Sequence, residues 1–236
     1  MKKKIFLLTC LLAVFTYQNV EAQEIRIFKK DGTVIRVTYA ELDSIVSVDS
    51  YEEEEFVDLG LSVKWASRNL GAKSPEDYGD YYAWGETSPK ESYTAENSLT
   101  CKKKMSDIGG NPKYDATTAV CGKDVRLPTK AEIQELKENT TTTWTERNGI
   151  KGCLVVSKKN GNSIFLPAAG NRYGTSLYNG GENGSYWSST PRESHDNDAY
   201  GFYFGSGGFD WGWNFRSNAQ SVRPVRDNTV GAEVNC

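Results

Sequence analysis

Apolar and polar residues alternate along much of the chain after residue 55, with the period of two that is typical of half-buried strands. Leu61, Val63 and Trp65 alternate with polar neighbours, and Tyr200, Phe202 and Phe204 share one face of a second such strand. Asn160-Gly161 lies between two apolar runs and predicts a β-hairpin. The strands expected on this basis cover 56–59, 61–65, 153–156, 163–166, 185–190 and 199–204.

Helical signals are confined to two short stretches. Thr129 and Glu132 have the spacing of a capping box, in which each side chain bonds the backbone N–H of the other residue. Ile133 and Leu136 then supply the apolar stripe of a helix that should end near Asn139. A shorter helix is expected over 115–119, and the polar segment 87–98 is expected to be a long loop.

The first residues have the pattern of an export signal. Lys2, Lys3 and Lys4 precede a short apolar run over 5–15, and Val20-Glu21-Ala22 offers small residues to a signal peptidase. We therefore predict a signal peptide over 1–22 and an exported protein that is periplasmic, secreted or on the outer surface. Lipoprotein anchoring through Cys10 is the less favoured alternative, because too few apolar residues precede it.

The remaining chain divides by pattern into four segments. Residues 23–50 predict a small β-hairpin element, because Asp31-Gly32 separates two β-rich runs. Residues 51–55 include four consecutive glutamates and predict an acidic linker. The main domain is expected over 56–226, and 227–236 is expected to be a flexible tail.

Charge and hydropathy narrow the classes of partner. The formal net charge is −3, and removal of the leader (three lysines and Glu21) changes it to −5, since −3 − 3 + 1 = −5. Such a balance gives no reason to expect a nucleic-acid partner. No segment after the leader is apolar enough for a transmembrane helix, so none is expected in the mature chain.

Cysteine and histidine spacing does not predict a metal site or a cofactor. Four cysteines follow the leader, at 101, 121, 153 and 236, and they allow three disulfide pairings. Cys101–Cys121 is the first pairing to test, because both residues flank one polar stretch.

Signals of catalysis are equally sparse. His195 is the one histidine of the chain and lies in the polar run 193–198, which is more typical of a loop at the end of a hairpin than of a catalytic cluster. The chain lacks the nucleotide-binding glycine motifs and H-E-x-x-H. A carboxylate pair for glycoside hydrolysis depends on spatial distance, so sequence neither reveals nor removes one. No catalytic residue is predicted.

The strongest functional signal is aromatic. Phe209, Trp211 and Trp213 lie among glycines, beside Asp210 and Asn214, in a stretch expected to be a loop. Exposed aromatic rings beside amide and carboxylate groups suit recognition of a protein or stacking on a sugar. The alternative is that these tryptophans are simply part of the core.

Six motifs along the main domain resemble one known family. In order they are FVDLGLSVKWA (56–66), YAWGE (82–86), RLPT (126–129), FLPAAG (165–170), YWSST (186–190) and SVRPV (221–225). This pattern resembles the Fibrobacter succinogenes major paralogous domain of exported Bacteroidetes proteins, over roughly 56–225. That family is similar to the formylglycine-generating-enzyme branch of the C-type lectin fold and to the variable proteins diversified by retroelements.

The resemblance implies an α+β, C-type lectin-like domain with two short helices, antiparallel strands, long loops and paired first and last strands. It also implies a ligand-binding face near the C-terminus. Carried over by position, that face comprises Arg192, His195, Asp196, Asn197, Tyr200, Phe202, Phe204, Phe209, Trp211, Trp213 and Asn214.

Differences from the related families limit which of their activities can be expected of this chain. The copper-binding cysteine pair of formylglycine-generating enzymes is not matched here, and the Glu-Pro-Asn and Trp-Asn-Asp signatures of calcium-dependent lectins are absent. The leading hypothesis is thus an exported module that binds a protein or a glycan. The alternatives are a divergent enzyme (a formylglycine-type oxidase or a glycan hydrolase) and a structural surface protein.

Overall fold

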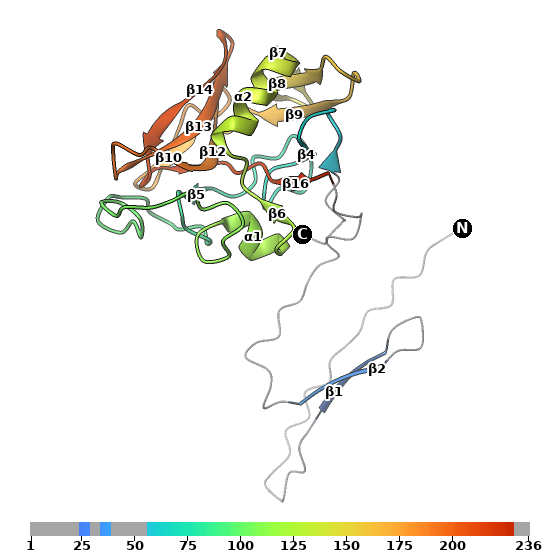
Figure 1. The fold of residues 1–236 in the computed structure, drawn as a ribbon, viewed down its shortest axis with the longest axis vertical. Coiled ribbons are helices and arrows are strands. Elements are labelled where there is room, and N and C mark those ends of the chain that lie inside the picture. Colours follow the sequence, from blue (N-terminus) through green and yellow to red (C-terminus); the bar gives the residue numbers. More distant parts are fainter. Residues whose placement is uncertain (1–23, 29–33, 39–55, 229–236) are drawn as a thin grey trace, which may run out of the picture. The chain divides into compact units, whose positions relative to one another are not determined.

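A computed structural model describes residues 24–28, 34–38 and 56–228, and it divides the chain into two units, 1–49 and 50–236. In the first unit, β1 (Glu24–Phe28) pairs antiparallel with β2 (Val34–Thr38), with Phe28 opposite Val34 (Figure 1). The two strands of the predicted N-terminal hairpin are thereby confirmed. The signal peptide, the Asp31-Gly32 turn and the acidic linker lie outside the described residues.

The second unit is an α+β domain of antiparallel sheets and two short helices. One sheet has the order β3 (Phe56–Val57), β4 (Val63–Ala66), β16 (Val225–Asp227) and β6 (Val125–Arg126). The last strand of the domain, β16, pairs with its second strand, β4, rather than with its first, β3, so both ends of the domain lie in one sheet. Asp227, which the sequence assigned to the tail, is instead the last residue of β16.

A second sheet follows directly from the longer helix. It comprises β7 (Thr140–Arg147), β8 (Ile150–Ser157) and β9 (Ser163–Pro167), and the predicted Asn160-Gly161 hairpin connects β8 to β9. The sequence did not predict β7. Its threonine-rich run is largely exposed and has no alternation of apolar and polar residues, so only pairing with β8 identifies it as a strand.

A third sheet is the meander β12 (Asn183–Pro191), β13 (Asp198–Gly205) and β14 (Gly208–Phe215). The prediction that Phe209, Trp211 and Trp213 lie in a loop is wrong, because β14 pairs with β13 along its whole length. The aromatic residues of β14 recur at every second position, which is the period of a strand. The intervening glycines concealed this pattern.

The fourth sheet has the order β11 (Ser176–Tyr178), β10 (Asn171–Tyr173), β15 (Ala219–Gln220) and β5 (Tyr82–Ala83). Residues 87–98 form the expected long loop, with an isolated bridge from Tyr93 to Gly174. Helix α1 (Ala116–Cys121) begins after the predicted Asp115, whose side chain caps it, and ends two residues beyond the predicted Ala119. No helix in the described ranges is long and apolar enough to cross a membrane.

Two clusters of apolar side chains form most of the core. Tyr186 and Trp187 are neighbours on β12, so their side chains project to opposite faces of the sheet. Tyr186 packs with Trp65 and Phe202 in one cluster, whereas Trp187 packs with Trp84 in the other. Trp65 and Trp187 are both buried. In Figure 1, α2 (Lys130–Asn139) lies against the meander, with which it makes contacts to all three strands.

The predicted capping box of α2 is present. Thr129 Oγ1 accepts a hydrogen bond from the Glu132 N–H at 3.2 Å, and Glu132 Oε2 accepts one from the Thr129 N–H at 2.8 Å. We expect Thr129→Ala to lower the free energy of unfolding by about 1 kcal/mol, because one donor at the helix start loses its partner. Urea denaturation measures this loss. Thr141→Ala, in an exposed position of β7, is the control, and equal losses in both variants would contradict a capping role.

The cysteines differ from expectation. Cys101 and Cys153 are free thiols, whereas Cys121 is disulfide-bonded. The predicted Cys101–Cys121 pair is therefore wrong, because Cys101 carries a free thiol. Burial raises the pKa of Cys153 to about 11, so this thiol stays protonated and unreactive at neutral pH.

Candidate ligand-binding surface

Three exposed aromatic residues gather on one face of the β13–β14 hairpin. Register places Tyr200 opposite Trp213 and Phe202 opposite Trp211, so all four side chains project to the same side. Trp211 is 36% exposed, Trp213 49% and Phe215 54%. These three residues alternate along β14, and together they make one continuous patch.

Helix α2 determines where this face is covered. Its last turn reaches the tip of the hairpin, where Lys137 pairs with Asp210 at 2.7 Å. Its first residue, Lys130, reaches Trp211. Trp213 and Phe215 follow Trp211 away from the tip and remain exposed. The exposed patch is thus the part of the sheet that extends past the start of the helix.

Two cations lie over the aromatic rings. Lys130 Nζ is 4.0 Å from the centre of the Tyr200 ring and 4.0 Å from that of Trp211. The Arg192 guanidinium lies 4.3 Å from the Trp213 ring and also pairs with Asp198 at 3.0 Å. Such contacts hold both partners in place. Lys130, Arg192, Tyr200, Trp211, Trp213 and Phe215 are called the aromatic surface below.

The loop between β12 and β13 is the polar hairpin loop that the sequence favoured. His195 and Asp196 are exposed at its tip, and His195 Nδ1 lies 2.8 Å from Ser194 Oγ. Asn197 was expected to contact ligand, but its Oδ1 accepts a hydrogen bond from the Lys102 N–H at 2.9 Å. Asn197 therefore joins this loop to the segment that contains Lys102.

A buried arginine that the sequence reasoning missed supports the base of the hairpin. Arg216 Nε donates to the Asp198 carbonyl at 3.0 Å, and its Nη1 donates to the Lys103 carbonyl at 2.8 Å. Its guanidinium also lies 4.5 Å from the Trp84 ring. Burial lowers the pKa of Arg216 from its ordinary value. These contacts fix the start of β13 against the segment 98–104.

Three predicted contact residues belong to the core and need correction. Phe202 is fully buried and Phe204 nearly so. Phe209 is half-buried and stacks on both, with ring centres 5.4 and 6.1 Å apart. These three rings lie on the same face of the hairpin as Tyr200 and Trp211, but the core covers the part of that face that they occupy. They position the aromatic surface and do not contact ligand themselves.

Asn214, the last predicted residue, lies on the opposite face of β14, where it lines a polar hollow together with Tyr203. The structure thus brings together Arg192, Tyr200, Trp211 and Trp213 of the predicted set. Lys130 and Phe215 were missed. Nothing in the sequence around Lys130 indicates that it reaches β14. Phe215 could have been identified, because it alternates with Trp213 along the strand.

A second hollow lies beside the aromatic surface. It has a volume of about 680 Å³ and is lined by Thr129, Lys130, Ala131, Gln134, Thr190 and Trp211. Its lining comes from the start of α2, the end of β12 and the exposed ring of β14. The aromatic surface therefore continues onto the first turn of the helix.

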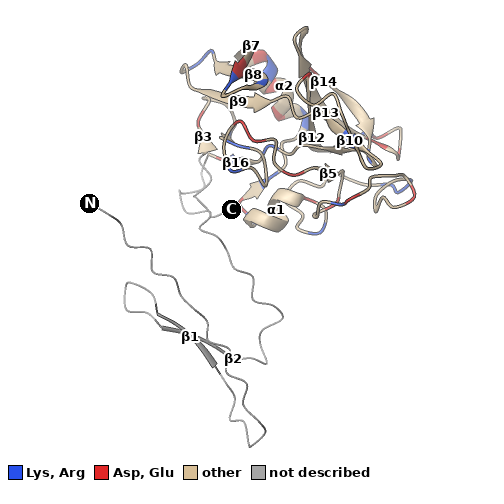
Figure 2. Cartoon of the chain, turned by 180° about the vertical axis from the view of Figure 1, so that it is seen from behind, with Lys and Arg blue, Asp and Glu red and all other residues tan. Residues whose placement is uncertain are grey.

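Charged residues of both signs lie on α2, whereas β12 and β13 carry few charged residues (Figure 2).

Comparison with known proteins finds one family model that matches part of the chain, and that family has no described function. Residues 125–225 match the model of a family described as a domain of unknown function (DUF8237). No curated protein and no solved structure matches the chain. The matched segment runs from β6 to the first residue of β16 and includes α2, the meander and the whole aromatic surface.

Proposed function

We propose that this protein is an exported ligand-binding module that recognises a protein or a glycan through the aromatic surface. The observation that carries the proposal is the pair of exposed tryptophans, Trp211 and Trp213, on a rigidly supported strand. Single exposed apolar residues are ordinary, but a contiguous aromatic patch is typical of an interaction site. Tryptophan, tyrosine and arginine, which compose most of this surface, are also the residues enriched at binding hot spots.

The geometry favours a protein over a glycan as the partner of this surface. A sugar that stacks on an aromatic ring needs a free ring face, and cations lie over Tyr200, Trp211 and Trp213. Aromatic rings and cations in one open patch are the usual composition of a protein–protein contact. The adjoining hollow at the first turn of α2 enlarges the area that such a partner would cover.

The finer description of the fold and location belongs to the same proposal. We assign a C-type lectin-like fold from the resemblance to the major paralogous domain, and it is supported by the two short helices, the long loops and the sheet that holds both ends of the domain. The basic and apolar leader supports export. A module of this kind would present the aromatic surface outside the cytoplasm, to a cell-surface or secreted partner.

We expect the double variant Trp211→Ala/Trp213→Ala to lose binding. Each substitution should lower the free energy of unfolding by much less than the roughly 3–5 kcal/mol of a buried tryptophan, because Trp211 is 36% and Trp213 49% exposed. Binding would be measured as the capture of proteins from host and bacterial surface extracts, with thermal melting to check the fold. Thr141→Ala/Thr143→Ala, in exposed positions of β7, is the matched control. Retained binding in a folded tryptophan variant would refute the proposal and favour a structural role.

A further inference from the structure

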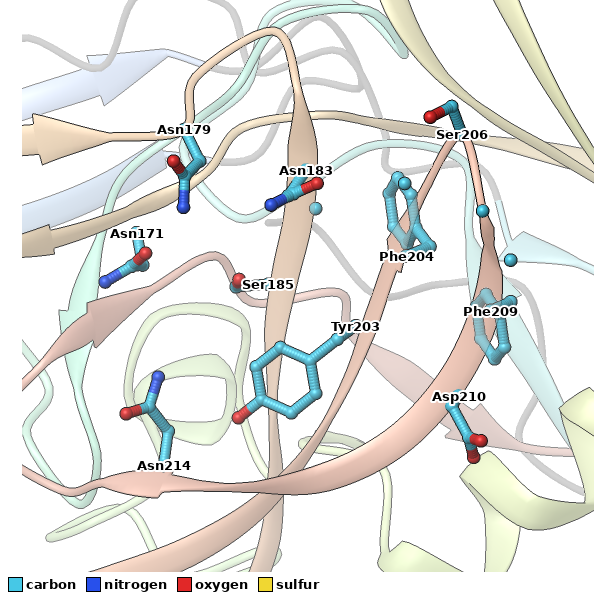
Figure 3. A pocket seen from close by; sticks show the side chains of 14 residues that line it. Asn171, Asn179, Asn183, Ser185, Tyr203, Phe204, Ser206, Phe209, Asp210 and Asn214 are labelled. Carbon is cyan, nitrogen blue, oxygen red and sulfur yellow. The ribbon is translucent and has the colours of Figure 1, made fainter.

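The opposite face of the same hairpin holds a hollow with a different chemistry. Six residues that define it here, Asn171, Asn179, Asn183, Ser185, Tyr203 and Asn214, are called the asparagine cleft, and the hollow has a volume of about 650 Å³. They come from β10, the segment after β11, and the three strands of the meander. Figure 3 shows Asn171, Asn179 and Asn183 gathered on one side of Ser185, with Tyr203 and Asn214 on the other.

The amides of this cleft are available to a ligand. Within the part of the chain that the structure describes, the side chains of Asn171, Asn179 and Asn183 make no hydrogen bond to another protein group. An asparagine amide offers two N–H donors and an acceptor oxygen. Three unengaged amides around one hollow therefore present both donors and acceptors to whatever enters it.

Backbone hydrogen bonds fix the main chain that carries Asn179 and Asn183. The Gly170 N–H donates to the Asn183 carbonyl at 2.7 Å, and the Asn183 N–H donates to the Asn179 carbonyl at 3.0 Å. Gly170 has a φ of +65°, and a Cβ there would lie 2.1 Å from the Tyr178 carbonyl oxygen. Only glycine permits this close approach. The backbone that forms the cleft is thus held in place before any ligand binds, as in most small-molecule sites.

Aromatic groups line and flank the cleft. Gln220 Nε2 donates a hydrogen bond to the Tyr203 hydroxyl at 3.3 Å, which helps to hold the tyrosine ring in place. Burial raises the pKa of Tyr203 to about 12, so its hydroxyl stays protonated and can donate. Tyr178 lies opposite Asn171 in the β10–β11 pair, so both project to the same side, and Tyr178 is exposed.

The charge of the lining restricts the class of ligand. Among the residues that the structure describes, no lysine, arginine or glutamate lines the hollow, and the one charged residue there, Asp210, is paired with Lys137 at 2.7 Å. An anionic ligand would therefore find no counter-ion. Sugar hydroxyls both donate and accept hydrogen bonds, as the amides do, and the faces of sugar rings pack on aromatic rings. A neutral saccharide matches both properties of the cleft.

We infer that the asparagine cleft is a second binding site, separate from the aromatic surface, and that it takes a neutral oligosaccharide without a metal ion. The inference does not depend on the proposed function, because the two sites lie on opposite faces of the β13–β14 hairpin. A protein partner on one face and a saccharide on the other would let one domain join a protein to a glycan.

The test is titration of the purified protein, in the presence of EDTA, with short neutral oligosaccharides built from glucose, galactose, mannose or N-acetylglucosamine. Isothermal calorimetry and saturation-transfer NMR would report binding. At least one neutral oligosaccharide should bind, and an oligogalacturonate of the same length should bind at least about tenfold more weakly. Binding to none of the neutral sugars at millimolar concentration, or equal binding of the acidic one, would overturn the inference.

Variants locate the site. Asn171→Ala/Asn183→Ala should weaken binding of the neutral sugar by about tenfold or more, through loss of hydrogen bonds from two amides. Asn183→Asp keeps the size and shape of the side chain, so it is expected to fold. It should also weaken binding, because a carboxylate lacks the two N–H donors of the amide. Trp211→Ala/Trp213→Ala and Thr141→Ala/Thr143→Ala should leave sugar affinity unchanged. If the tryptophan variant lost the sugar, or the asparagine variants kept it, the cleft would not be a separate saccharide site.

Discussion

Replacing Trp187 by alanine is expected to lower the free energy of unfolding by roughly 3–5 kcal/mol, the usual range for removal of a large buried aromatic side chain. Trp187 is buried in the second core cluster, and its Nε1–H donates to the Tyr82 carbonyl at 2.8 Å. The substitution thus leaves a cavity and also leaves a buried acceptor without its donor. Urea denaturation measures the loss, and Trp211→Ala, at an exposed site, is the control of equal size.

Trp65 allows the packing and hydrogen-bonding contributions to be separated. It is as deeply buried as Trp187, so its alanine variant should lose a similar amount. Its Nε1–H, however, has no hydrogen-bond partner among the described residues. Trp187→Phe should therefore be more destabilising than Trp65→Phe by about 1 kcal/mol. If the alanine variants lost less than about 1 kcal/mol, neither tryptophan would be a core residue.

The second large effect is expected at Arg223, in the SVRPV motif. Its side chain is fully buried and donates to three acceptors: Asn69 Oδ1 at 3.0 Å, the Ala66 carbonyl at 2.9 Å and the Phe165 carbonyl at 2.8 Å. Arg223→Met removes these donors, and each buried acceptor without a donor costs about 1–3 kcal/mol. We expect the free energy of unfolding to fall by about 3 kcal/mol or more.

Two further variants test the reason for this loss. Arg223→Lys keeps the positive charge but not the planar fork of donors, so it should remain strongly destabilising. Arg147→Met removes an arginine whose side chain is 47% exposed and pairs with Glu76 at 3.5 Å, and it should lower stability much less than Arg223→Met. A stable Arg223→Met protein would mean that these acceptors do not depend on the arginine.

The sequence alone determined the features that depend on residues close together along the chain. The start of α2 was predicted because Thr129 and Glu132 satisfy each other's backbone N–H groups over three residues. The β8–β9 hairpin was predicted because Asn-Gly favours a tight turn wherever it lies between β-rich runs. Trp65 followed from its place in a strand of period two. Trp211 and Trp213 were predicted as surface candidates from aromatic density near the C-terminus, whereas Tyr200 entered the candidate set through the family resemblance.

Only the tertiary structure decided which part of a strand face is covered. Phe202 and Trp211 lie opposite each other on β13 and β14, yet the first is in the core and the second is exposed. Their local patterns are alike, and the difference arises from where α2 and the core end. The strand β7 depended on its partner β8 in the same way.

The chemistry of the two candidate sites likewise depends on residues that are distant in sequence. Lys130 meets Tyr200 and Trp211 because α2 packs on the meander, and the asparagine cleft exists because β10 and the segment after β11 approach β12 and β14. Helix starts, turns and strand periods are properties of short segments, so the sequence determined them. Burial, ring–cation contacts and clefts are properties of packed surfaces, so only the fold could decide them.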